Sequence, residues 1–513
     1  MAKRSFVDLI EKQEKKSNKT FTENGAVAYE SSGKFALDFN FKLSQYRNMT
    51  ESEIKNDFTK VYFEDPMVAT KFAFYIGDVR GGLGERKVFR ACLDWLADNK
   101  PDVADKVLEL VPEYTRWDNL IRLVDHPKMR EAILDIIVNS LSNDIKNMNE
   151  GKSISLLAKW LPSVNASSKE TKARAKSIIR GLEVTEKDYR QTLSTLRSYL
   201  KIVEVKASAN QWSEIDYEAV PSQANLKYKN AFMKHDEDRR LRYLDSLKKG
   251  EVKINASVAQ PHEIVSKYND GGWWSDRVKA YDETLEQMWK ALPNIAVEDT
   301  LVVRDGSGSM TRQAGNSKTT CLDIATALAI YCAEHNSPAW KDKFITFSSR
   351  PKFVNLENCK TLRDKLVRTF KEEDCSNTDI EATMRLILKT AVSNKLTQEE
   401  MPGNILIISD MQFDAGSRWC SLGWNKSLFE EIAEEYKENG YKLPRIIFWN
   451  VCSRDFDTIP MQDNENGLIL CSGFSTNNMK MFMSGEVNPY KVLLEQINSE
   501  RYVPIELAIK EVI

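Results

Sequence analysis

Residues Thr300–Met310 read TLVVRDGSGSM, and this stretch decides the fold predicted for the C-terminal part of the chain. A short strand-like run leads to Asp305, Ser307 and Ser309, which alternate with glycines. Because glycine allows a tight turn at the edge of a sheet, one carboxylate and two hydroxyls gather around a single point. Oxygen ligands of this kind suit one hard divalent cation, Mg²⁺ or Mn²⁺. The open alternative is a plain strand-to-helix turn in which serine caps the helix.

An octahedral cation needs more oxygen ligands than one loop supplies, so other loops at the same sheet edge should provide them. Thr378 precedes the helix-like run 380–388, and Asp410 ends the strand-like stretch NILIISD. The series Asp305, Ser307, Ser309, then Thr378, then Asp410 resembles the metal-ion-dependent adhesion site of von Willebrand factor A domains. This resemblance implies one bound Mg²⁺ (or Mn²⁺) ion, with a coordination position left open for an oxygen of a partner.

Strand-like and helix-like segments alternate through residues 296–513, which predicts a doubly wound α/β domain of the von Willebrand factor A type. Parallel strands with helices on both faces would place the ligand site beyond the carboxyl ends of the strands.

Residues 35–295 have mainly helical patterns, joined by short links that contain Pro, Gly, Asn or Asp. Helices with links this short predict an all-α, HEAT-like helical-repeat domain that forms a solenoid or bundle. Residues 1–34 are expected to form a weakly structured N-terminal arm. The sequence therefore predicts a multidomain protein.

The composition is that of a soluble chain, with 42% hydrophobic and 29% charged among 513 residues. No apolar run reaches the roughly 18–20 residues that span a bilayer, and the charged N-terminus lacks the apolar centre of a secretory signal. Eight cysteines without a CxxC pair indicate free thiols in a reducing compartment, so we expect a cytoplasmic protein without membrane contact.

Catalytic residues are not apparent, and we expect no enzyme activity. The four histidines lie far from the DGSGSM motif in sequence and lack zinc-ligand spacing. A serine hydrolase would need a nucleophile-elbow G-x-S-x-G stretch, whereas the one Gly-Ser-Gly here belongs to the predicted metal motif. A metal-dependent hydrolase would need a second metal or a general base.

Positive charge is concentrated in residues 151–250, which hold 20 Lys and Arg against 12 Asp and Glu. Such a basic segment indicates RNA binding, or alternatively a solvated helix face. The glycine-rich stretch 77–90 is likewise either a plain link between helices or a phosphate contact through its arginines. Candidate RNA-binding residues are Arg80, Arg86, Lys172, Arg174, Lys176, Arg180, Arg190, Arg197, Lys234 and His235.

Several short motifs occur in a fixed order ahead of the metal motif. They are VRGGLGER, RWDNL, LAKWLPS, VPSQANLKYKNAF, KHDEDR, KIN and PHEIV. This series resembles the TROVE module of the Ro ribonucleoprotein autoantigen family, and especially a related family in bacteria, phages and plants. The resemblance implies a ring of helical repeats, closed by the A domain, that binds structured non-coding RNA and single-stranded RNA ends. Where the Ro family tends to have Arg-His-Asp, this chain has Lys234-His235-Asp236, which keeps the charge without the bidentate fork of arginine.

These observations predict a monomeric, ribonucleoprotein-type RNA-binding protein whose magnesium site contacts a partner. The alternative is a protein-interaction adaptor that binds no RNA and uses the metal to hold an acidic residue of another protein.

Overall fold

The computed structural model describes residues 19–21, 27–270, 278–315, 317–347, 351–372, 380–411, 428–452, 459, 467–482 and 484–513. The chain divides into two compact units, each built from two separate segments. The first unit combines Met1–Glu64 with Ala259–Ile497, and the second combines Asp65–Val258 with Asn498–Ile513. A helical region and a mixed α/β region are both present, so the multidomain prediction is confirmed at this level. The ranges 1–34, 35–295 and 296–513 stay a prediction.

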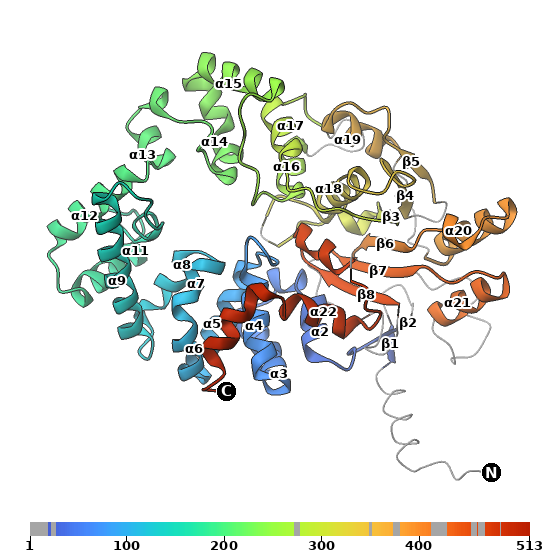
Figure 1. The fold of residues 1–513 in the computed structure, drawn as a ribbon, viewed down its shortest axis with the longest axis horizontal. Helices are drawn as coiled ribbons and strands as arrows, with labels where there is room; N and C mark the ends of the chain where they lie inside the picture. Colours follow the sequence, from blue (N-terminus) through green and yellow to red (C-terminus); the bar gives the residue numbers. More distant parts are fainter. Residues whose placement is uncertain are drawn as a thin grey trace, which may run out of the picture. The chain divides into compact units, whose positions relative to one another are not determined.

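A mixed sheet forms the centre of the first unit (Figure 1). Its order among the described residues is β5-β4-β3-β6-β7-β8, and only the β4–β5 pair is antiparallel. The antiparallel edge differs from the parallel sheet expected from the sequence, because β5 follows β4 after a link too short for a crossover helix. The bounds are β3 Thr300–Asp305, β4 Lys343–Phe347, β5 Phe353–Asn355, β6 Asn404–Ser409, β7 Arg445–Asn450 and β8 Leu468–Ser472.

The central strand β3 lies between β4 and β6 and is parallel to both. The chain first adds β4 on one side of β3 and later returns to add β6 on the other side. Such a reversal creates a crevice at the carboxyl ends of the two central strands, where α/β proteins bind ligands. Arg304 is paired with Ile408, so Asp305 and Ser409 reach this edge side by side.

Helices of the first unit pack against this sheet and against one another. The helix α18 follows β3 and contacts it, and a capping box between Thr320 and Asp323 fixes its first turn. A two-stranded hairpin, β1 Lys19–Phe21 and β2 Val27–Tyr29, precedes the helices. The helices are α2 Phe35–Phe41, α3 Glu51–Glu64, α16 Pro261–Tyr268, α17 Glu283–Lys290, α18 Cys321–Glu334, α19 Leu362–Lys371, α20 Ile380–Asn394, α21 Leu428–Glu438 and α22 Pro489–Ile497.

The segment that includes α2 is part of the α/β unit although it lies near the N-terminus. The backbone N–H of Ser44 donates to Ser472 Oγ at 3.0 Å, and the hydroxyl of Ser44 donates to the carbonyl oxygen of Asn450 at 2.8 Å. In return, the amide of Asn450 donates to the carbonyl oxygen of Phe41 at 3.2 Å. Because Asn450 and Ser472 end β7 and β8, these bonds attach the N-terminal segment to the carboxyl edge of the sheet.

The second unit is helical throughout its described residues, apart from loops. Its first helix, α4, begins with Pro66, and Asp65 caps it by accepting the N–H of Val68 at 3.0 Å. The helices are α4 Pro66–Gly77, α5 Arg86–Asn99, α6 Pro101–Val107, α7 Val111–Tyr114, α8 Trp117–Ile121, α9 Arg130–Asn149, α10 Leu157–Trp160, α11 Lys169–Gly181, α12 Glu186–Tyr199, α13 Val203–Ser208, α14 Ser222–His235, α15 Glu237–Lys249 and α23 Val503–Ile509.

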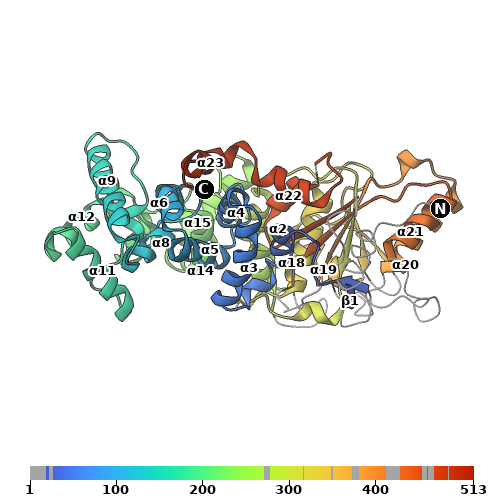
Figure 2. The same cartoon turned by 90° about the horizontal axis from the view of Figure 1, so that it is seen from below.

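The C-terminal segment returns to this helical unit, and α23 lies beside α4 and α6 (Figure 2). Asp78, which is fully buried, accepts a hydrogen bond from Arg501 Nη2 at 2.9 Å and another from the hydroxyl of Tyr502 at 3.0 Å. The hydroxyl of Tyr114 donates to the carbonyl oxygen of Arg501 at 2.6 Å. A buried, multiply bonded carboxylate therefore joins the start of the unit to its C-terminal segment.

The described residues also show whether helices could cross a membrane and whether cysteines form disulfides. None of their helices combines the length and apolar character needed to cross a membrane. Their cysteines are free thiols, and all of them except Cys359 are buried.

Candidate functional site

Asp305 lies at the carboxyl end of β3 and is fully buried. Its Oδ1 accepts the N–H of Ser307 at 2.8 Å, and its Oδ2 accepts the hydroxyl of Ser409 at 2.6 Å. Ser409 Oγ itself accepts the N–H of Met411 at 3.0 Å, so its own proton points to Asp305. Asp305 is therefore held in one orientation by the loop after β3 and by the end of β6.

Asp410 follows β6 directly and is 1% exposed, so two carboxylates are buried at neighbouring strand ends. Burial raises the pKa of Asp305 to about 7, and the charge of Asp410 contributes to this rise, against the lowering effect of the Ser409 and Ser307 hydrogen bonds. Burying two like charges is unfavourable unless a cation or a proton compensates them. The chemistry of this pair therefore fits a cation.

Ser307 and Ser309 are half-buried, and their hydroxyl oxygens lie 2.9 Å apart. Gly308 between them is exposed, and a Cβ added there would meet no atom of the described residues within 4 Å. The two hydroxyls are thus accessible, whereas the two carboxylates beside them are buried. Thr378, the fifth predicted ligand, lies outside the described residues.

In the alternative interpretation, a serine of the DGSGSM loop would cap the helix that follows β3. Thr320, not a serine of the DGSGSM loop, caps the helix α18. Ser307 precedes the short 3₁₀ turn Gly308–Thr311 but makes no side-chain cap hydrogen bond to it. The two serine hydroxyls are therefore not used in capping the elements that follow β3.

Ser409 was not among the predicted site residues, yet its hydroxyl orients Asp305. The signal in the sequence was a polar residue after the apolar run Ile405–Ile408, immediately before Asp410. The backbone after the strand is also unusual, because Met411 has a φ of 62°, which non-glycine residues rarely adopt. Unusual backbone of this kind is concentrated at functional sites.

Metal sites can also be made of His, Cys, Asp and Glu side chains alone. In the part of the chain that the structure describes, no group of three or more of these residues is arranged to hold a metal ion. A cation at the β3–β6 edge would therefore depend on serine hydroxyls in addition to Asp305 and Asp410.

A cationic cluster of Arg86, Arg90 and Arg116 surrounds Asp118 in the second unit. Arg116 binds both carboxylate oxygens of Asp118, at 2.9 and 2.7 Å, and Arg90 Nη2 lies 2.8 Å from Oδ2. Arg86 Nη1 is 3.8 Å from the same oxygen, and its side chain is 51% exposed. Burial and then the charge of Arg116 lower the pKa of Arg86. Within the described residues, three positive charges thus share one negative charge.

Three of the sequence motifs meet at this cationic cluster. VRGGLGER provides Arg86, RWDNL provides Arg116 and Asp118, and LAKWLPS provides Trp160. The guanidinium of Arg116 lies 4.4 Å from the centre of the Trp160 ring, which is a cation–π contact. An arginine-rich surface with an adjacent half-buried aromatic ring is an arrangement that suits nucleic acid.

Other predicted RNA-binding residues have internal partners. Arg80 Nη1 donates to the carbonyl oxygen of Glu113 at 3.0 Å. Arg174 pairs with Asp125 and Glu170 at 3.4 and 3.0 Å. Arg197 donates to two backbone carbonyls and to Ser163 Oγ, at 2.7 to 2.8 Å. The charges of these three arginines are at least partly used within the unit.

The remaining candidates are exposed and are not brought together at one place by their helices. Lys172, Lys176 and Arg180 lie on α11, Arg190 lies on α12, and Lys234 and His235 end α14. His235 stacks on Trp212, with 4.6 Å between the ring centres and 6° between the ring planes. Asp236, the last residue of the Lys-His-Asp triplet, accepts hydrogen bonds from Tyr217 and Arg239, both at 2.8 Å.

Comparison with known proteins identifies two family models along the chain. Residues 299–503 match a domain of unknown function, DUF7788, and residues 22–115 and 119–296 match another, DUF2828. The chain is also 29% identical to an uncharacterised protein of Acanthamoeba polyphaga mimivirus, over 95% of this chain and 88% of the viral protein. Because the DUF2828 model matches more than half of its residues, the chain belongs to the family described as domain of unknown function DUF2828.

Proposed function

We propose that this protein binds RNA through the cationic cluster of its helical unit and acts in the cytoplasm as a ribonucleoprotein component. The observation that carries the proposal is the crowding of three guanidinium groups around the carboxylate of Asp118. Clustering like charges is unfavourable for folding, and a polyanion bound nearby would compensate it. Phosphates would contact Arg86 and Arg116, and an unpaired base would stack near Trp160.

We further propose that the edge of the sheet formed by β3 and β6 binds one Mg²⁺ ion. Ser307 and Ser309 would bind the ion through their hydroxyls, and Asp305 and Asp410 would bind it directly or through water. The buried carboxylate pair and the accessible hydroxyls support this proposal. When bound, the ion supplies a Lewis-acidic position for an oxygen of a partner. The proposal includes the von Willebrand factor A and HEAT-like assignments, which rest on the sequence resemblance.

RNA binding is tested by measuring the affinity for a single-stranded oligoribonucleotide across a salt series. With about six phosphates engaged, the logarithm of the binding constant should fall with the logarithm of salt concentration at a slope of roughly −4 to −5. Arg86→Gln should weaken binding and reduce this slope by about one. Arg174→Gln is the matched control, because its charge is already paired with two carboxylates. Salt-insensitive or absent binding would contradict the proposal.

The second candidate function is a protein-interaction adaptor without RNA. It is favoured by the partial exposure of Ser307 and Ser309, whose hydroxyls a metal-bound carboxylate of another protein would approach. An adaptor would bind an acidic peptide in the presence of Mg²⁺, and Ser307→Ala would weaken that binding while the Arg86→Gln variant behaved as wild type. The two candidates thus respond to substitutions in different units.

A further inference from the structure

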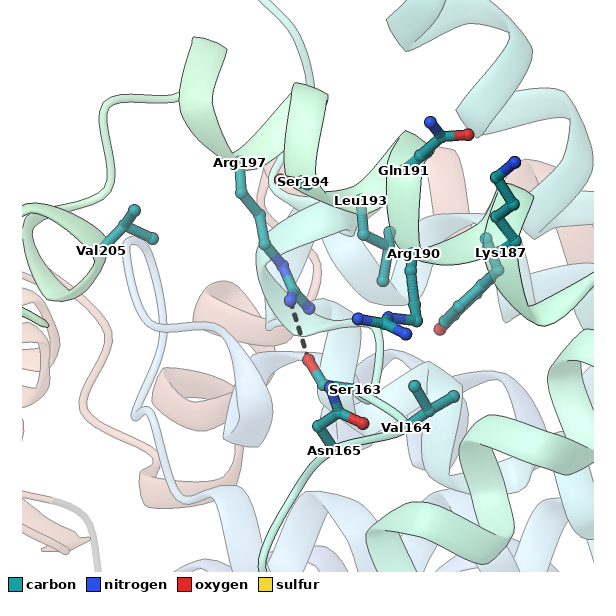
Figure 3. A pocket seen from close by; sticks show the side chains of 11 residues that line it. Ser163, Val164, Asn165, Lys187, Arg190, Gln191, Leu193, Ser194, Arg197 and Val205 are labelled. Carbon is teal, nitrogen blue, oxygen red and sulfur yellow. Dashed lines mark hydrogen bonds between the residues drawn. The ribbon is translucent and has the colours of Figure 1, made fainter. Parts of the chain in front are cut away.

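The helical unit contains a pocket of about 590 Å³ between α12 and the loop that follows α10 (Figure 3). Val164 and Leu193 provide apolar lining, and Ser163 and Asn165 provide polar groups. Three lining side chains are cationic and none is acidic, although acidic residues are common elsewhere in the unit. The volume lies within the range of small-molecule sites, about 300–1,000 Å³.

Two guanidinium groups define the polar end of the pocket. Figure 3 shows the side chains of Arg190 and Arg197 both directed toward Ser163 and Asn165, while the amine of Lys187 points away from them. Within the described residues, Arg190 is exposed and has no hydrogen bond or ion pair. Its planar fork of N–H groups is therefore available for a bidentate contact with an anion.

Arg197 is held rigidly but keeps some donor capacity. Its Nε and Nη2 donate to the carbonyl oxygens of Ala158 and Leu161 at 2.8 and 2.7 Å, and Nη1 donates to Ser163 Oγ at 2.8 Å. A guanidinium has five N–H groups, so two remain beyond these bonds. Ser163 Oγ accepts from Arg197, which leaves the hydroxyl proton of Ser163 able to donate into the pocket. Arg197 and Ser163 are thus held in place with N–H and O–H groups still available to an anion.

We propose that this pocket binds one nucleotide unit, with its phosphate between Arg190 and Arg197 and its base against Val205, the apolar lining residue that is exposed. A phosphate matches the excess of positive charge better than a monocarboxylate, because it carries up to two negative charges and three acceptor oxygens. The apolar lining would cover an uncharged, flat group. The unit could be a free nucleotide or one nucleotide of a single strand, since both offer the same groups to these residues.

The test is calorimetric titration of the full chain with uridine 5′-monophosphate, adenosine 5′-monophosphate and the corresponding nucleosides. We expect at least one of the nucleotides to bind at least about 10-fold more tightly than its nucleoside, since charge-assisted hydrogen bonds to phosphate are lost with the nucleoside. Arg190→Gln should weaken this binding by about 10- to 100-fold, and Arg190→Lys, which keeps only the charge, should weaken it less. Arg242→Gln replaces an exposed arginine of α15 that does not line the pocket, and this variant should bind as wild type.

A single-stranded oligouridylate without terminal phosphates distinguishes the two sources of the nucleotide. If a mononucleotide binds and binding depends on Arg190, a free nucleotide is enough to occupy the pocket. If only the oligonucleotide binds and binding depends on Arg190, the pocket takes one nucleotide of a strand. Either outcome supports the proposal. The proposal would be overturned if nucleoside and nucleotide both bound with equal affinity, if Arg190→Gln bound as tightly as Arg242→Gln, or if none of these ligands bound. Because the RNA proposal depends on Arg86 and this one on Arg190, failure of one is distinguishable from failure of the other.

Discussion

Replacing Asp305 by asparagine should abolish a stabilisation of the protein by Mg²⁺. The wild-type carboxylate is fully buried beside Asp410, and the pKa of Asp305 is raised by burial and by that second charge. In the absence of a cation, the ionised pair destabilises the fold above neutral pH. A bound Mg²⁺ ion compensates the pair, whereas asparagine removes one of the two charges that attract the ion.

The size of the effect follows from the geometry. Without Mg²⁺, the Asp305→Asn substitution relieves the repulsion but loses one hydrogen bond, because the amide nitrogen of asparagine cannot accept from Ser307 or Ser409. The lost hydrogen bond costs about 1 kcal/mol, and the removal of the repulsion between the two carboxylates offsets this cost. The melting temperature without Mg²⁺ should therefore hardly change. With Mg²⁺ at about 100 times its dissociation constant, the wild type gains about 2.7 kcal/mol, while the variant gains little. For a unit of this size that corresponds to a rise of roughly 5 °C.

Thermal unfolding followed by circular dichroism above neutral pH, with EDTA or with millimolar Mg²⁺, measures this difference. The matched control is Asp299→Asn, which replaces a carboxylate at the opposite end of β3 whose oxygens bond Trp340 and Gly403. This control should respond to Mg²⁺ as the wild type does. The reasoning is refuted if Mg²⁺ leaves the wild-type melting temperature unchanged, or if Asp305→Asn responds as strongly as Asp299→Asn.

Three further predictions concern stability. Asp78→Ala should destabilise the helical unit by about 3 kcal/mol in urea titrations, at the low end for a buried ion pair because Arg501 is 35% exposed; a loss below about 1 kcal/mol would contradict this account. Gly82→Ala should prevent stable folding, since a Cβ there would lie 1.9 Å from a backbone oxygen. Gly485→Ala, whose Cβ would meet no described atom within 4 Å, should melt as wild type. Burial, followed by the charge of a nearby arginine, lowers the pKa of His262 from 6.5 to about 3. Between pH 6.5 and about 3, only the unfolded state gains a proton at this histidine. The free energy of unfolding of the wild type should therefore fall by up to about 1.4 kcal/mol per pH unit as the pH falls from 6.5, and that of His262→Gln should depend less on pH.

Local patterns in the sequence predicted the regular elements well where periodicity was strong. The apolar runs before Asp305 and Asp410 are strands β3 and β6, and the run after Thr378 is the helix α20. Because parallel strands end at the same edge, the sequence also predicted that Asp305 and Asp410 lie in neighbouring loops. The prediction of five metal ligands stays open, since it depends on Thr378 and on an ion.

Contacts between distant segments were not predictable from such patterns. Ser44 and Asn450 are 406 residues apart in sequence, and Asp78 and Arg501 are 423 apart. Ser44 follows the helix α2, and Asp78 follows the helix α4. Neither position has a local sequence feature that predicts its hydrogen-bond partner. The compact units combine α2 with the segment that contains the sheet, and the last residues with the helical segment, and local patterns do not predict groupings across such separations.

Most residues discussed from the motifs that resemble RNA-binding proteins make contacts within the fold. The order of these motifs therefore does not by itself indicate contacts with RNA. A Cβ at Gly82 would lie 1.9 Å from the carbonyl oxygen of Tyr75, so this glycine of VRGGLGER is needed for close packing. Arg239 of KHDEDR donates to Asp236 Oδ2 and to the carbonyl oxygen of Ile215, both at 2.8 Å. Arg86 differs, because it is half exposed in a cluster with excess positive charge. Packing alone would favour a neutral residue at that position. The RNA proposal therefore depends on Arg86 and its neighbours, and an Arg86→Gln variant that folded more stably yet kept its full RNA affinity would leave the cluster without a function.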